Sequence, residues 1–197
     1  MTRVEPLKLE DIPELLDVFE PVKARMGFIP TSQLTMAHKP ALLKAFVNLT
    51  RAVYQQDEGS VPVPLKNLVG HMASRSAGCQ YCVAHTGSNA SRSGVEDRKI
   101  AAIWEYETSP LFSDAERAAL RFAQAGAQVP NMVTDDDVEA LKKHFTSFQI
   151  VELTSVISVF GFLNRWNDTM ATTLEEEPAG FAERALAGAG WAIGKHG

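Results

Sequence analysis

Apolar residues recur at the spacing of a helix along most of the chain, and no stretch alternates between apolar and polar residues as a strand does. One apolar stripe follows Pro40, a residue suited to the first turn of a helix, and consists of Leu42, Leu43, Phe46, Leu49 and Val53. Gly and Pro residues separate this segment from others with the same period. The pattern predicts an all-α fold, a bundle of about eight helices.

Two short polar motifs mark where helices begin. Ser113 is followed by Glu116, and Thr134 by Asp137, so each pair can form a capping box. Ser147 leads into the longest apolar stretch of the chain, residues 150–163. A helix that is apolar nearly all round must be covered on every side. We therefore expect a homo-oligomer, because a single layer of short helices leaves one side of this helix wet.

Length and composition fit one soluble globular domain, residues 1–197. We expect an N-terminal helical pair at about residues 9–56, a core that contains both cysteines at about 62–172, and a short C-terminal tail. The proline-broken segment Val61–Pro64 links the first two parts. Little periodicity remains after Leu186, so the end of the tail is expected to be loose.

Charge and targeting signals exclude several classes of partner. Lys and Arg number 19 against 24 Asp and Glu, which gives a net charge of -5 and leaves no basic field for a nucleic acid. Residues 1–6 do not resemble a secretory signal, and the stretch 150–163 is shorter than the roughly 20 residues that span a bilayer. We expect a cytoplasmic protein that binds neither nucleic acid nor membrane.

The residues most suited to chemistry are Cys79, Cys82 and His85. Each is three positions from the next, so the three side chains lie along one face of a helix. Backbone N–H groups at a helix N-terminus favour a thiolate, and a nearby imidazole can exchange its proton. We expect Cys82 to have the lower pKa of the two thiols, and Cys79, nearer the loop, to be the more accessible.

Other interpretations of these residues stay open. Two cysteines can be half of a zinc site, but zinc takes four ligands and the chain has no second Cys-x-x-Cys, so we predict neither a metal nor a cofactor. Asn67, His71 and Ser74 lie opposite the apolar stripe of the preceding helix. This face is either solvated or turned toward the cysteines, with His71 supplying protons.

The segment from Pro64 through Gly94 resembles the carboxymuconolactone decarboxylase-like superfamily, in particular its alkylhydroperoxidase D (AhpD)-like members. The likeness extends to Gly27–Pro30, Pro40–Leu43 and Phe160–Asp168. It implies that Cys82 attacks a hydroperoxide, Cys79 resolves the product into a disulfide, and His85 transfers protons. It also implies a thiol or dithiol protein as the reductant and a trimeric or hexameric assembly.

Two positions depart from the pattern of this family. The AhpD-like arrangement has a glutamate twelve residues before the first cysteine, where this chain has Asn67. The family histidine commonly lies four residues after the second cysteine, whereas His85 lies three after Cys82. An asparagine cannot carry a proton, so Asn67 breaks the glutamate-to-histidine relay and His71 becomes a candidate substitute.

Two further functions remain compatible with the sequence. One is a lyase on a small lactone or carboxylate, with His71 and His85 as acid and base. The other is a redox sensor without catalytic turnover. A dithiol enzyme and a sensor both lose two thiols on oxidation, whereas a lyase loses none.

Overall fold

The computed structural model describes residues 2–197, and in that range it contains ten α-helices, five short 3-10 helices and no strand. The all-α prediction is confirmed, although the number of helices exceeds the expected eight or so. The additional helices include α2 (Thr31–Met36) and α10 (Glu176–Ala185). In both segments the apolar residues repeat over too few positions for a helical period to be recognised.

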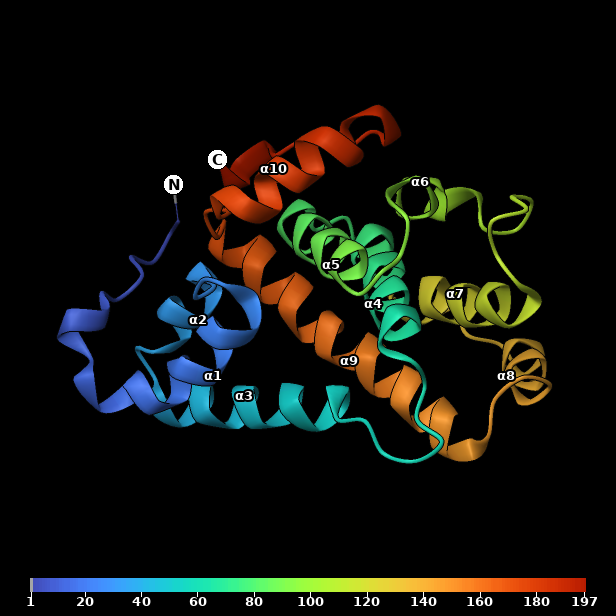
Figure 1. Ribbon diagram of the computed structural model, residues 1–197, viewed down its shortest axis with the longest axis horizontal. Coiled ribbons are helices and arrows are strands. Elements are labelled where there is room, and N and C mark those ends of the chain that lie inside the picture. Colours follow the sequence, from blue (N-terminus) through green and yellow to red (C-terminus); the bar gives the residue numbers. More distant parts are fainter. Residues whose placement is uncertain (1) are drawn as a thin grey trace.

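Four helices form the core: α4 (Val63–Ala77), α5 (Gln80–Arg92), α7 (Asp114–Gly126) and α9 (Ser147–Met170). Helix α4 packs against the other three, and α9 runs diagonally beneath the α4–α5 pair (Figure 1). The approach of α4 to α9 is close at Gly70, where a Cβ would lie 2.5 Å from the ring of Phe160. Only glycine leaves room for this contact.

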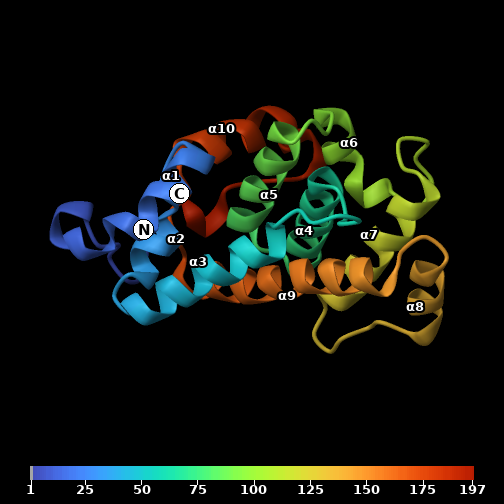
Figure 2. The same cartoon turned by 60° about the horizontal axis from the view of Figure 1, so that its bottom comes forward.

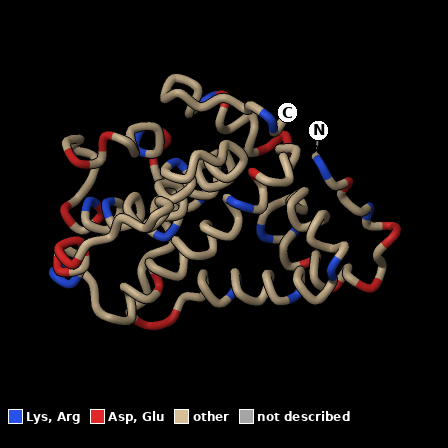
Figure 3. Tube along the Cα trace, turned by 180° about the vertical axis from the view of Figure 1, so that it is seen from behind, with Lys and Arg blue, Asp and Glu red and all other residues tan. Residues whose placement is uncertain are grey.

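The right-hand end of Figure 1 is closed by α6 (Asp97–Ala101), a 3-10 turn (Ala102–Glu105), α7 and α8 (Asp135–Lys142). Both predicted capping boxes are present, Ser113 with Glu116 at α7 and Thr134 with Asp137 at α8. Cationic and acidic residues are interspersed over the trace (Figure 3).

The N-terminal part holds more than the expected helical pair. Two 3-10 turns (Leu9–Asp11 and Pro13–Leu15) precede α1 (Leu16–Met26), α2 and α3 (Pro40–Tyr54). Helix α3 lies along α9, while α1 and α2 gather at the end of the molecule where α10 begins (Figure 2). This end contacts α5, where Arg92 donates hydrogen bonds to the Arg25 and Met26 carbonyls.

The C-terminal tail is ordered, which corrects the expectation of a loose end. Helix α10 packs on α5 and is followed by 3-10 turns at Ala187–Ala189 and Gly194–His196. Trp191 is 7% exposed and donates a hydrogen bond from its ring nitrogen to the Gln80 carbonyl, at 3.0 Å. His196 is 1% exposed. Contacts with distant parts of the chain hold this segment in place. Such contacts leave no periodic pattern in the sequence.

Helix α9 is longer than the apolar stretch 150–163 from which it was predicted. By length and composition it could cross a membrane, but its inner face packs on α4 and carries Glu152, whose carboxylate pairs with the buried Lys66. It packs in the core of the described fold. Its outer face exposes Phe148, Val151 and Phe162, so the rest of the chain does not wrap it completely.

Candidate functional site

Both cysteines lie at the start of α5 because Gly78 ends α4 there. Gly78 has a φ of +76°, a left-handed conformation that glycine adopts without strain, and its N–H bonds back to the Arg75 carbonyl. Cys79 is then the N-cap of α5, and Cys82 lies in the first turn. Both sulfurs therefore lie next to this turn and inside the core.

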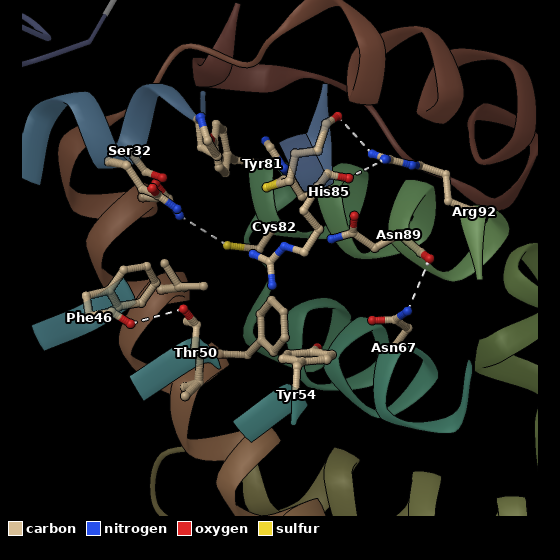
Figure 4. A pocket seen from close by; sticks show the side chains of 18 of the residues that line it. Ser32, Phe46, Thr50, Tyr54, Asn67, Tyr81, Cys82, His85, Asn89 and Arg92 are labelled. Carbon is tan, nitrogen blue, oxygen red and sulfur yellow. Dashed lines mark hydrogen bonds between the residues drawn. The ribbon is translucent and has the colours of Figure 1, made fainter. Parts of the chain in front are cut away.

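A cavity of about 310 Å³ opens beside Cys82. In Figure 4, Cys82 lies between Tyr81 and His85 above and Phe46, Thr50 and Tyr54 below. Much of the remaining lining is contributed by α1, α4, α5 and α9 and includes Arg25, Met26, Asn67, Asn89, Arg92, Val159, Phe160, Leu163 and Asn167. Most of the wall is apolar, so the cavity suits a small and largely apolar molecule.

The two thiols differ in their access to this cavity. Cys82 lines it, whereas Cys79 lies behind Cys82 and is fully buried. The expectation that Cys79 is the more accessible sulfur is therefore wrong. The N-cap position faces the packed end of the chain, where α9 and the C-terminal turn cover it.

The pKa order of the thiols is also opposite to the expectation. A hydrogen bond from the Cys82 thiol, and the His196 imidazole nearby, lower the pKa of Cys79 despite its burial. Burial and the adjacent Cys79 raise the pKa of Cys82, although the Asn167 amide donates to its sulfur at 3.4 Å. The surroundings of the pair therefore favour ionisation of Cys79 before Cys82.

His85 lines the cavity and is joined to a carboxylate that the sequence did not reveal. Its Nε2 lies 2.6 Å from Oε2 of Glu175, the residue that precedes α10. The other carboxylate oxygen accepts hydrogen bonds from the Tyr81 hydroxyl, at 2.8 Å, and from the Thr31 N–H. Tyr81 also stacks on the His85 ring, with centroids 4.4 Å apart. A glutamate–histidine pair is thus present, with its acid supplied from another helix.

The Glu175 carboxylate is expected to stabilise the fold in a pH-dependent way. Burial alone would raise its pKa, but His85 and the Thr31 N–H together hold the pKa below the ordinary value of 4.5. A depressed carboxyl pKa contributes stability that is complete above the unfolded pKa and is lost as pH falls through the folded one. In urea denaturation, the stability difference between the native chain and Glu175→Gln should be present at pH 7 and shrink below pH 4.5. An equal difference at both pH values would contradict this.

The two proposed relay residues of α4 are placed differently. Asn67 lines the cavity, but its amide donates to the Asn89 carbonyl and to Ser93 Oγ, both at 3.1 Å. His71 does not line the cavity; it is fully buried between α4 and α5, where its Nδ1 lies 3.0 Å from Thr86 Oγ1. Burial and the nearby Arg75 lower the pKa of His71 to about 3, so it is neutral at physiological pH.

Behind Cys79, the fold assembles a second polar group. The Cys79 Sγ, a carboxylate oxygen of Asp168 and a ring nitrogen of His196 all lie within 4.8 Å of one another. These three donors are one fewer than the four ligands of a structural zinc site. Asp168 belongs to the motif at the end of α9 that the sequence singled out, whereas His196 lacked any local signal.

Comparison with known proteins agrees with this architecture. The sequence model that describes the carboxymuconolactone decarboxylase family matches residues 40–125, which include both cysteines and His85. The debrominase Bmp8, solved as a cysteine-to-alanine variant in complex with 2,3,4-tribromopyrrole, is 32% identical with a TM-score of 0.85. That alignment covers 94% of this chain and 98% of the other. The chain belongs to the carboxymuconolactone decarboxylase family.

Other known proteins are similar at lower identity or over a shorter segment. A peroxidase-related protein with an AhpD core from Ralstonia eutropha JMP134 is 23% identical with a TM-score of 0.80, over 92% of this chain and 95% of that one. At that identity the likeness shows an AhpD-like fold. YnjA of Escherichia coli (strain K12) is 35% identical over 107 residues, which are 54% of this chain and 58% of that protein.

Proposed function

We propose that this protein is a dithiol oxidoreductase that reduces a small hydroperoxide through a Cys79–Cys82 disulfide cycle. The observation that carries the proposal is the position of Cys82: it is the cysteine on the cavity wall, and its partner lies directly behind it. Such a pair can give two electrons to a molecule held in the cavity. The fold and family support an enzyme of this broad kind.

The first step starts from the charge on Cys79. The Cys82 proton passes to the Cys79 thiolate, and the Cys82 sulfur then attacks the terminal oxygen of the hydroperoxide. The O–O bond breaks, the Cys82 thiolate becomes a sulfenic acid, and the alkoxide leaves as an alcohol after taking a proton from His85. Glu175 holds the His85 ring in place at 2.6 Å.

The second step forms the disulfide. The Cys79 sulfur attacks the sulfenic sulfur of Cys82, the S–O bond breaks, and water leaves. The Cys79 proton and the departing hydroxide make up that water. A thiol or dithiol protein then reduces the disulfide by exchange. We also propose the reducing cytoplasm as the compartment, because the cycle needs this reductant; the two free cysteines support this.

A second substrate class is favoured by the likeness to Bmp8 over almost the whole chain. A halogenated aromatic ring needs the same two electrons: two thiols and one carbon–halogen bond become a disulfide, a carbon–hydrogen bond and a hydrogen halide. Phe46, Tyr54, Tyr81 and Phe160 give the cavity aromatic walls against which a ring can pack.

Counting free thiols after a stoichiometric pulse tests the proposal and separates the substrates. The reduced protein should lose both thiols within one turnover of tert-butyl hydroperoxide, and added dithiothreitol should then sustain turnover. A parallel sample with 2,3,4-tribromopyrrole, analysed for released bromide, tests the second class. Oxidation without turnover would indicate a redox sensor. No thiol loss with either substrate would overturn the proposal and favour a lyase.

We also propose that a second copy of the chain covers the outer face of α9, in a trimer or a hexamer. A groove of about 470 Å³ lies between α3 and α9, bordered by the exposed apolar residues Leu49, Val151 and Phe162. Phe46 and Val159 line both this groove and the substrate cavity. A second copy that packs in the groove would therefore also contact residues that form one wall of the substrate cavity.

Sedimentation equilibrium at micromolar concentration is expected to show a mass several times 21.5 kDa. Val151→Glu places a charge on the most exposed apolar residue of this face and should shift the protein toward the monomer. Glu139→Gln, on the surface of α8, serves as the matched control. A native species of 21.5 kDa would contradict the assembly.

A further inference from the structure

The C-terminal turn supplies a buried histidine to the back of the thiol pair. His196 is 1% exposed, and its Nδ1 lies 2.8 Å from the carbonyl oxygen of Thr172. A carbonyl oxygen can only accept, so Nδ1 carries a hydrogen, and in the neutral imidazole Nε2 then carries a lone pair. Nε2 is fully buried and has no hydrogen-bond partner among the described residues. A buried acceptor of this kind is costly unless something uses it.

What His196 faces is the sulfur that the cavity does not reach. Its ring, the Asp168 carboxylate and Cys79 Sγ lie within 4.8 Å of one another, and Nε2 is 3.8 Å from Asp168 Oδ1. Lys195 pairs with the other oxygen of Asp168 at 2.8 Å and balances its charge. Cys82 on α5 and the Tyr81 ring, 5.8 Å from the imidazole, complete the surroundings.

The tail is anchored so that this arrangement is held in place. The Leu174 N–H donates to the His196 carbonyl at 2.8 Å, and Trp191 ties the preceding turn to Gln80. The imidazole is therefore fixed at both its backbone and its Nδ1. This resembles the way in which a catalytic imidazole is oriented through one nitrogen so that the other is free to exchange a proton.

We propose that His196 is the proton acceptor of the resolving cysteine, so that residues 79, 168 and 196 form a proton-transfer group on the side of the thiol pair away from the substrate. The inference deepens the proposed function. When Cys82 has passed its proton to Cys79 and has been oxidised, Cys79 must lose that proton before it can attack. His196 Nε2 takes the proton, the Cys79–Cys82 bond forms, and the same proton leaves with the hydroxide as water.

The position of Cys79 makes such an acceptor necessary. The sulfur is fully buried, so bulk water cannot take its proton, and His85 lies on the cavity side with its Nε2 already paired to Glu175. The low pKa of Cys79 agrees with a polar partner at this place. Two separate proton-transfer groups thus serve the two sulfurs.

The test first measures the Cys79 thiolate without any substrate. In a Cys82→Ser background Cys79 is the single thiol, and its ionisation is followed by thiolate absorbance at 240 nm as a function of pH, with EDTA present throughout. Adding His196→Gln keeps an amide that can donate to Thr172 but removes the proton acceptor. We expect the Cys79 midpoint to rise by about one pH unit or more. His144→Ala, which removes an exposed histidine of the same chain, should leave it unchanged.

The second measurement uses both cysteines and a single pulse of tert-butyl hydroperoxide. In His196→Gln, Cys82 sulfenic acid should still form, slowed no more than the smaller fraction of Cys79 thiolate requires, and should accumulate as its dimedone adduct, while the disulfide forms about 10²–10⁴-fold more slowly. Unchanged thiolate midpoints and disulfide rates in both His196→Gln and His196→Ala would overturn the inference. If the native chain is not oxidised by peroxide, the proposed function fails, while the absorbance titration still decides the role of His196.

Discussion

Replacing Cys82 by serine is expected to abolish oxidation of the protein by its substrate. Cys82 is the cysteine that lines the cavity, and a serine hydroxyl there remains protonated and cannot accept the oxygen or halogen that a sulfur accepts. Peroxide consumption in the presence of dithiothreitol should fall to the level of a sample without protein. The fold should be intact, because the substitution is nearly isosteric.

Cys79→Ser is the matched variant, with an opposite result. Cys82 still faces the cavity, so one equivalent of peroxide should be consumed and Cys82 sulfenic acid should persist, since no second thiol condenses with it. The first step should also be slower than in the native chain, because the Cys79 thiolate that takes the Cys82 proton is absent. Persistent single-turnover oxidation in Cys82→Ser and none in Cys79→Ser would reverse the roles assigned to the two sulfurs.

Replacing Glu152 by glutamine is expected to destabilise the fold by about 3–5 kcal/mol. The Lys66 ammonium is fully buried on α4 and lies 2.6 Å from the Glu152 carboxylate of α9. It also donates to the carbonyls of Val53 and Gln55, so a single cation joins α3, α4 and α9. Glutamine retains an acceptor for the Val61 N–H but leaves a buried charge without its counter-ion. Urea denaturation followed by circular dichroism measures the loss.

Two further variants serve as controls for the stability loss in Glu152→Gln. Glu139→Gln removes the partner of Lys142 in an ion pair that is more than half exposed on both sides, and should change stability by less than about 0.5 kcal/mol. The double variant Lys66→Met, Glu152→Leu removes both buried charges and should recover most of the lost stability. Equal losses in Glu152→Gln and Glu139→Gln would show that burial does not set the strength of the α4–α9 pair.

Local chemistry was enough to predict much of this protein. Ser113 with Glu116 and Thr134 with Asp137 satisfy backbone donors only a few residues away, so their capping boxes are visible in the sequence. The Cys-x-x-Cys-x-x-His spacing likewise places its three side chains along one helix, and the structure brings Cys82 and His85 onto one cavity wall. Of the two relay candidates of α4, Asn67 lines this cavity and His71 does not, and a catalytic role for either stays a prediction.

The partners of these residues come from distant parts of the chain. Glu175 lies 90 positions from His85 and stands in a run of three glutamates, none of which a periodic pattern distinguishes. The pKa order of the thiols reversed for the same reason: the helix terminus favours either sulfur, while burial and the neighbouring groups decide between them.

The helical class, several helix starts and the candidate thiol pair could be predicted from the sequence, because each depends on residues within a few turns of one another. Packing between distant segments was needed to show which thiol lines the cavity, which acid pairs with His85, and that His196 lies close to Cys79. Those outcomes depend on how α9, α10 and the C-terminal turn pack over the start of α5. Packing of this kind is a sum of many weak contacts between remote segments, and no local pattern records it.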